Sequence, residues 1–187
     1  MLLAVDVGNT QTHFGTFCGD ELVERWRFAT IAESTADEIG ADRLANAIAI
    51  RDRFGGPAIC VDFGTSVNFD IVGHAGDFLG GVIVPGVEIS LAALTARGAR
   101  LPQIDLLAPR TLIGKSTVDA IRSGVIYGFA GAIDGILRRL LDELGEETDV
   151  IATGGLAGAI VPFTELIDGI DDMLTLTGLR LLHERNA

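Results

Sequence analysis

Residues 58–65 read Ala-Ile-Cys-Val-Asp-Phe-Gly-Thr, a short apolar run that ends in an Asp-x-Gly turn. Residues 2–8 read Leu-Leu-Ala-Val-Asp-Val-Gly and repeat this pattern, so that Asp6 corresponds to Asp62 at an offset of 56 residues. After each run, two further strand-like segments occur, joined by a polar turn. This internal duplication of a strand, turn, strand, strand unit predicts an α/β protein built from two related halves.

The two halves differ in length after their third strand. The second has the long tail 85–187, whereas the first has only 30–57 before the next strand begins, so the first half looks cut short. We therefore place the halves at 1–57 and 58–187. The predicted strands are 2–8, 10–18, 21–29, 58–65, 67–72, 78–84 and 149–152, and the predicted helices are 41–54, 86–94, 116–144 and 174–185.

Composition narrows the class of protein. The 187 residues include 26 acidic and 14 basic ones, a net charge of −12, which argues against a nucleic-acid or anionic membrane surface. The 48% of hydrophobic residues suffices for a core, and no apolar run approaches the ~18 residues of a membrane span. The carboxylate of Asp6 comes too early for a signal peptide, and we expect Cys18 and Cys60 to be buried thiols, so the predicted location is the cytoplasm.

The two Asp-x-Gly turns are suited to phosphate. Glycine lets backbone N–H groups approach a phosphate, Asn9 and Thr10 add donors, and Asp6 could hold a hydrated Mg²⁺. One such turn alone is more often an ordinary hairpin, but a matching pair favours a nucleotide gripped from both sides. A third strand and Gly-Gly turn at 149–157 would suit an adenine or ribose, or equally a tight strand-to-helix connection.

Taken together, the motifs resemble the type III pantothenate kinase family, which phosphorylates pantothenate with ATP at the start of coenzyme A synthesis. The resemblance implies the duplicated ribonuclease-H-like fold of the acetate and sugar kinase, heat-shock ATPase and actin superfamily. It also implies a homodimer with pantothenate sites near the subunit interface and a need for K⁺ or NH₄⁺. In chain order the motifs are Asp6-Val7-Gly8-Asn9-Thr10, Gly40-Ala41-Asp42-Arg43, Asp62-Phe63-Gly64-Thr65, Gly80-Gly81-Val82-Ile83-Val84-Pro85-Gly86, Ile113-Gly114-Lys115-Ser116-Thr117 and Thr153-Gly154-Gly155-Leu156.

The resemblance assigns roles by matching position. Asp42 would accept the proton of the pantothenate hydroxyl, Arg43 could meet the substrate carboxylate, and Asp62 would help to hold the monovalent cation. Without the resemblance, Asp42 and Arg43 would be interpreted as ordinary residues at the beginning of a helix, and Thr117 as an ordinary residue in the first turn of another helix. The residues implied for ATP are Asp6, Val7, Gly8, Asn9, Thr10, Gln11, Thr12, His13 and Thr65. Those implied for the pantothenate pocket are Gly40, Ala41, Asp42, Arg43 and Thr117.

The chain departs from the family between Thr35 and Gly40. There it lacks a helix–strand–helix–strand portion of the first half and the Tyr-containing segment that precedes Gly40 in the family. This leaves two alternatives to the pantothenate kinase: a catalytically impaired nucleotide-binding homologue with a regulatory or no catalytic role, and a kinase for another small acid or sugar. His13 stands where a cationic residue is frequent. The stretch 123–136 is either a dimer face or ordinary core.

Overall fold

The computed structural model describes residues 2–7, 11–18, 21–29, 40–97 and 104–184, and for the strands before residue 30 it describes the backbone. It confirms the predicted strands and helices to within a few residues and adds two short helices and a short strand, α4, η1 and β8. The elements are β1 (Leu2–Val7), β2 (Gln11–Cys18), β3 (Glu21–Ala29), α1 (Ala41–Phe54), β4 (Ala58–Phe63), β5 (Ser66–Val72), β6 (Phe78–Pro85), α2 (Val87–Arg97), α3 (Thr117–Leu144), β7 (Asp149–Thr153), α4 (Ala157–Ile160), η1 (Val161–Phe163), β8 (Gly169–Ile170) and α5 (Leu174–Glu184).

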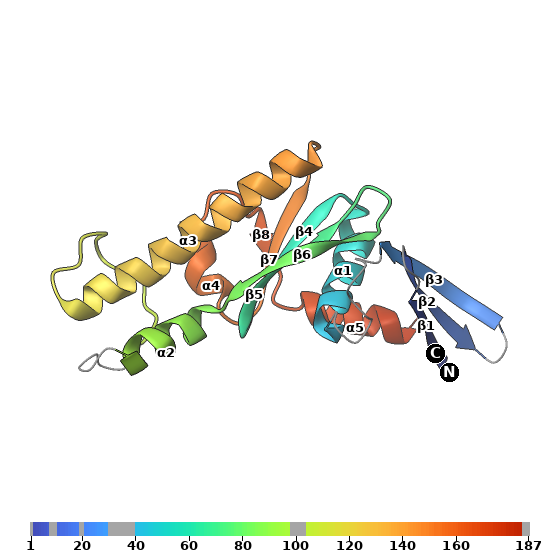
Figure 1. The fold of residues 1–187 in the computed structure, drawn as a ribbon, viewed down its shortest axis with the longest axis horizontal. Helices are drawn as coiled ribbons and strands as arrows, with labels where there is room; N and C mark the ends of the chain where they lie inside the picture. Colours follow the sequence, from blue (N-terminus) through green and yellow to red (C-terminus); the bar gives the residue numbers. More distant parts are fainter. Residues whose placement is uncertain (1, 8–10, 19–20, 30–39, 98–103, 185–187) are drawn as a thin grey trace.

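The second half is built on a five-stranded sheet in the order β6-β5-β4-β7-β8 (Figure 1). β4 pairs with β5 in antiparallel fashion and with β7 in parallel fashion. β4 lies in the middle of the sheet and is covered on both faces, and five of its six residues are accordingly buried. Its carboxyl end, with Asp62, lies beside the carboxyl end of β7.

Alternation along β4 divides the core into two layers. Ile59, Val61 and Phe63 face one side, where they pack in the same cluster as Ile126, Ile133 and Leu137 of α3. Ala58 and Cys60 face the other side and pack with residues of α1 and α5. Asp62 follows this alternation, so its side chain belongs to the face that α1 and α5 cover.

The first three strands form a separate antiparallel sheet in the order β1-β2-β3, next to α1 and α5 in Figure 1. Its connectivity matches that of β4-β5-β6, and Asp6 pairs with His13 as Asp62 pairs with Asn68. The structure therefore bears out the duplication that the sequence predicts. Among the described residues β1 has one neighbouring strand, whereas β4 has two.

Helix α1 packs on α5 at a close crossing that depends on a glycine. A Cβ added to Gly178 of α5 would lie 2.0 Å from the carbonyl oxygen of Ala45, so only glycine lets the two backbones come this near. α1 also contacts β4 and β5. The segment that comes after the join at Thr35 is thus seated on the sheet of the second half.

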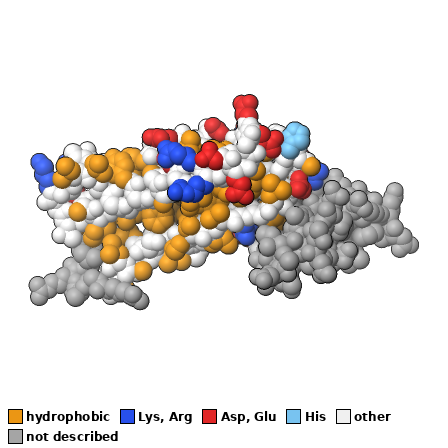
Figure 2. Space-filling view, turned by 45° about the horizontal axis from the view of Figure 1, so that its top comes forward, with side chains coloured by type: hydrophobic (Ala, Val, Ile, Leu, Met, Phe, Trp, Pro, Cys, Tyr) orange, Lys and Arg blue, Asp and Glu red, His pale blue; other side chains and the backbone are white. Residues whose placement is uncertain are grey.

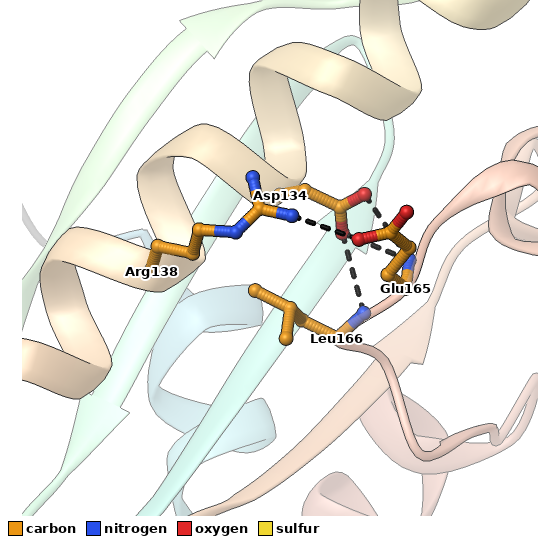
Figure 3. A network of polar contacts seen from close by, with 4 residues as sticks. All are labelled: Asp134, Arg138, Glu165 and Leu166. Atoms are coloured by element: carbon orange, nitrogen blue, oxygen red, sulfur yellow. Dashed lines mark hydrogen bonds and ion pairs between the residues drawn. The ribbon is translucent and has the colours of Figure 1, made fainter.

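Helix α3 has well-defined ends and is tied to the segment after η1. The Ser116 hydroxyl accepts the N–H of Asp119 at its beginning, and Gly145 ends it in the left-handed conformation with φ 67°. Figure 3 shows the buried Asp134 carboxylate accepting the backbone N–H groups of Glu165 and Leu166. These bonds fix the segment that leads into β8.

One side of α3 is apolar and exposed. Hydrophobic side chains gather on this side of the molecule in Figure 2, and α2 and α3 enclose a groove of about 640 Å³. The 28-residue α3 is, by length and composition, long and apolar enough to cross a membrane, although Arg122 and Asp134 interrupt its apolar sequence. Ile126, Ile133 and Leu137 of the same helix are buried in the protein core.

Candidate active site

The parallel pair β4 and β7 brings two glycine-containing turns together at its carboxyl end. Asp62 stands opposite Thr153 in the register, so the turn 63–65 and the turn 154–156 leave the sheet side by side. Ligands of α/β proteins bind at the carboxyl ends of such strands, where the loops diverge. This edge is therefore the candidate site of the second half.

The two turns touch at Gly154. This residue has φ +92°, and a Cβ added to it would lie 2.6 Å from both Asp62 Oδ1 and the carbonyl oxygen of Phe63. On the other side of the first turn, a Cβ on Gly86 would lie 2.1 Å from the carbonyl oxygen of Thr65, which accepts the Gly86 N–H at 3.1 Å. The walls here are backbone, which is what close approach to a phosphate requires.

Helix α1 brings its first turn to the same sheet edge. Gly40 is its N-cap residue and Asp42 is exposed in the first turn. One turn further along α1, Asn46 donates a hydrogen bond to Asp62 at 3.1 Å, which places the first turn of α1 near Asp62. The motif carrying the implied proton acceptor thus lies beside the second Asp-x-Gly turn, although the two are 20 residues apart in the chain.

A side chain of α1 holds the Asp62 carboxylate by a hydrogen bond. The Asn46 side chain donates to Asp62 Oδ2 at 3.1 Å and accepts the Thr175 hydroxyl at 2.7 Å. Burial raises the pKa of Asp62, the hydrogen bond from Asn46 lowers it, and the charge on Asp42 raises it. Its Oδ1 atom remains directed at the glycine turns.

Arg43 is held by an ion pair within the chain. Its Nε atom donates to Asp70 Oδ1 at 2.6 Å, and its guanidinium lies over the Phe78 ring at 5.6 Å. A Cβ on Gly81 would lie 2.4 Å from an Arg43 Nη atom, so the guanidinium occupies the space that this glycine leaves. Asp70 is fully buried, and a buried carboxylate takes the nearest cation because its desolvation is otherwise uncompensated. The described partner of Arg43 is therefore Asp70.

The ion pair leads to a prediction about pH. Burial raises the pKa of Asp70 to about 6, against the opposing effect of Arg43. Between pH 4 and 6 the folded protein then binds a proton at Asp70 that the unfolded chain has lost. The contribution of Asp70 to the free energy of unfolding should fall by about 3 kcal/mol as the pH rises through this window, and then level off. Denaturant unfolding from pH 4 to 8 measures this slope, and Asp70→Asn should flatten it. Equal slopes in the two proteins would contradict the assignment.

Cys60 is the buried free thiol that the sequence predicts. Burial raises its pKa well above the usual value, and the charges of Asp70, Asp62 and Asp171 act in the same direction. The thiol is therefore kept protonated and has no part in nucleophilic chemistry. The side chain of Cys18 lies outside the described residues.

The remaining implied residues lie in three places. Thr65 is exposed in the turn after β4, and Thr117 is exposed at the beginning of α3, where it lines the groove between α2 and α3. In the first half, Asp6 and Val7 end β1, and Gln11, Thr12 and His13 begin β2. Gly8, Asn9 and Thr10 lie outside the described residues, so the facing of the two Asp-x-Gly turns remains a prediction.

The donors at this edge fit a hard monovalent cation and the phosphates of a nucleotide. Asp62 Oδ1 and the Phe63 carbonyl oxygen both lie against Gly154, and oxygen atoms of this kind are what hard cations prefer. Over the residues that the structure describes, no group of three or more His, Cys, Asp or Glu side chains could hold a metal. The side chain of Asp6, which the resemblance assigns to Mg²⁺, lies outside the described residues.

Comparison with known proteins decides the family. A sequence profile described as type III pantothenate kinase matches residues 2–40 and 30–139, which together cover most of the chain. The type III pantothenate kinase of Frankia alni is 40% identical over 249 aligned positions that cover all of both chains. That of Moorella thermoacetica is 38% identical over 254 positions, again covering both in full. The chain belongs to the type III pantothenate kinase family.

This member of the type III pantothenate kinase family lacks an internal segment that its relatives have. The alignment with the Frankia alni protein has 249 positions and this chain has 187 residues, which leaves 62 positions without a residue here. The two profile matches meet at residues 30–40, where the sequence indicated the join. The deficit is thus internal, in the first half.

A solved structure supports the fold of this type III pantothenate kinase family member. A Campylobacter jejuni protein described as a Baf family transcriptional activator superposes with a TM-score of 0.54 over 99% of this chain and 98% of its own. At 19% identity the likeness concerns the fold alone. The superposition extends over almost all of both chains, so this solved structure shares the α/β fold described above.

Sequence reasoning did not find three side chains that shape the site: Asn46, Asp70 and Thr175. Asn46 and Thr175 are 129 residues apart, and Arg43 and Asp70 are 27 apart. One signal was present, because Asn46 follows Asp42 by four residues and so shares its helix face. Asp70 could have been noticed as a carboxylate between the apolar residues Phe69 and Ile71 of β5.

Proposed function

We propose that this chain transfers the γ-phosphoryl group of ATP to the hydroxyl of pantothenate, the first step of coenzyme A biosynthesis, in the cytoplasm. The observation that carries the proposal is the hydrogen bond from Asn46 to Asp62 at 3.1 Å, because Asn46 lies one turn after Asp42 on α1 and so brings the first turn of α1 to the carboxyl end of β4. Family membership supplies the substrate class, and this juxtaposition supplies a proton acceptor next to a phosphate-binding edge.

The chemistry divides between Asp42 and the turns. The pantothenate hydroxyl gives its proton to Asp42, its oxygen forms a bond to the γ-phosphorus, and the bond from that phosphorus to the bridging oxygen breaks to release ADP. The Thr65 hydroxyl, together with residues 8–10, would hold the phosphates in line, whereas the Gly64 N–H already donates to the Ser66 carbonyl oxygen at 2.9 Å. Mg²⁺ neutralises phosphate charge when bound, and Asp6 would hold it through water.

Asp62 is the proposed ligand of a monovalent cation, K⁺ or NH₄⁺. Its Oδ1 atom and the Phe63 carbonyl oxygen lie together against the Gly154 turn. Asn46 occupies the other carboxylate oxygen, so one oxygen is available to a cation. A cation there would offset the charge of Asp62 next to the nucleotide phosphates.

The position of Thr117 supports a homodimer. Helix α3 has 28 residues and so spans roughly 42 Å, and its beginning lies at the opposite end of the second half from α1 (Figure 1). Thr117 therefore cannot reach Asp42 within one chain. It lines the apolar groove between α2 and α3, beside Leu94 and Phe129, so a second copy seated there would bring Thr117 to an interface. We propose that the pantothenate pocket combines Asp42 of one copy with Thr117 of the other.

Mixed dimers test this arrangement. Asp42→Asn and Thr117→Val are each expected to impair a homodimer, since both of its sites carry the defect. A dimer with one chain of each kind has one site with both native residues, so co-expressed, doubly tagged dimers should recover about half of the native activity. Activity equal to the mean of the two impaired parents would show that each site is made by a single chain.

The shortened first half favours one rival function. Sixty-two alignment positions are missing, and the resemblance implies that a segment preceding Gly40, which would contact pantothenate, is among them. The rival is a nucleotide-binding homologue without kinase activity. To distinguish these functions, the protein is incubated with ATP and either pantothenate, another small hydroxy acid or a hexose, and the products are analysed by mass spectrometry. The proposal predicts phosphorylated pantothenate alone. Another product would redefine the substrate, and no product from protein that binds ATP would favour the rival.

A further inference from the structure

Asn46 is a fully buried polar side chain with two hydrogen-bond partners. It lies one turn after Asp42 on α1 and is 0% exposed. Its Nδ2 donates to Asp62 Oδ2 at 3.1 Å, and its Oδ1 accepts the Thr175 hydroxyl at 2.7 Å. Three elements, α1, β4 and α5, thus meet at one amide group.

The chemistry of the partners fixes the orientation of this amide. An ionised carboxylate can only accept, so the NH₂ group of Asn46 must face Asp62. Its carbonyl oxygen then faces Thr175, whose hydroxyl donates. A reversed amide would set two acceptors against each other at Asp62, so the buried group has one favourable orientation.

The amide also decides which oxygen of Asp62 is free. Oδ2 is taken by Asn46, whereas Oδ1 lies 2.6 Å from the position of a Cβ on Gly154 and 3.7 Å from that of one on Gly64. Oδ1 therefore faces both glycine turns. Without the hydrogen bond from Asn46, the Asp62 carboxylate could rotate, and Oδ1 would no longer face the glycine turns.

We propose that Asn46 is a positioning residue for Asp62: it holds Oδ2, directs Oδ1 to the cation and phosphate edge, and is itself fixed by Thr175 of α5. This inference rests on the proposed role of Asp62. It joins that role to the helix that carries Asp42, so the cation site and the proton acceptor are set by the same rigid element. Partners of this kind are worth about 10–100-fold in metal affinity or activity.

The test compares cation binding with stability in four variants. Asn46→Leu removes both bonds at similar volume, Thr175→Val removes only the support of the amide, and Thr175→Ser keeps the hydroxyl. Asp134→Asn is the matched control, because it weakens buried hydrogen bonds of α3 away from Asp62. The apparent K⁺ affinity is read from the rise in Tm with K⁺ in the presence of Mg-ATP, at ionic strength held constant with choline chloride. ATP Kd and pantothenate-dependent ADP release are measured in parallel.

We expect Asn46→Leu to weaken K⁺ binding about 10-fold or more and Thr175→Val about 3- to 10-fold. Thr175→Ser and Asp134→Asn should stay within about twofold of the native protein, although Asp134→Asn lowers Tm at zero K⁺. If Asn46→Leu lowers Tm but leaves K⁺ affinity unchanged, Asn46 has a purely structural role and the inference is overturned. If Asn46→Leu does not fold, the same result in Thr175→Val leads to the same conclusion. A native protein whose Tm does not change with K⁺ would also overturn the inference. Pantothenate-dependent ADP release would still test the kinase activity separately.

Discussion

Asp42→Asn is expected to lower kcat for pantothenate phosphorylation by about 10²- to 10⁴-fold. Asparagine has nearly the same shape but cannot accept the hydroxyl proton. ATP Kd should change by less than about twofold, because Asp42 lies in the first turn of α1 and the glycine turns that would hold phosphates lie on β4 and β7. Steady-state kinetics and titration calorimetry measure the two effects.

Asp142→Asn is the matched control for this substitution. Asp142 is exposed near the end of α3, so it changes the net charge equally without touching the candidate site. It should leave kcat and ATP Kd unchanged. Equal turnover in Asp42→Asn and Asp142→Asn would remove Asp42 from the role of proton acceptor.

Gly154→Ala is expected to have the second largest effect. Its φ of +92° is unfavourable for any side chain, at a cost of about 1–3 kcal/mol, and the new Cβ would overlap Asp62 Oδ1 and the Phe63 carbonyl oxygen at 2.6 Å. The turn after β4 must shift to relieve the overlap. A shift of about 1 Å at a reacting site costs about 100-fold, so kcat/KM for ATP should fall by that order.

Gly155 provides the control one residue later. A Cβ added there meets nothing within 4 Å, and its φ is not in the left-handed region. Gly155→Ala should therefore keep the Tm and ATP kinetics of the native protein to within about twofold. If both alanine variants behaved alike, the contact between the two turns would have no part in nucleotide binding.

The second half of the fold was predictable because its signals are local. The apolar run that begins at Ala58 is followed by the Asp-x-Gly turn at Asp62, which marks the end of β4. Glycine turns at Gly145 and Gly154 lie on either side of β7. The limits of these strands and helices could therefore be placed from the sequence. β8 has only two residues and carries no such signal. Its place beside β7 depends on Asp168, whose carboxylate accepts the Val150 N–H at 2.8 Å.

The candidate site was predictable only in part. The Asp42 and Asp62 motifs could be found by resemblance, but the link between them through Asn46 could not, because it depends on how α1 packs on β4 and α5. Arg43 shows the same limit. A sequence motif cannot say that Asp70 is buried beneath it, and this buried carboxylate decides which partner the guanidinium takes.

The most direct test of the kinase assignment is ADP release from Mg-ATP in K⁺ buffer, with and without pantothenate, on native protein whose oligomeric state is known. We predict a dimer whose ADP release depends on pantothenate, which would mean that the 62 missing positions are dispensable for phosphoryl transfer. A well-folded dimer that binds ATP but releases no additional ADP with pantothenate would contradict the assignment.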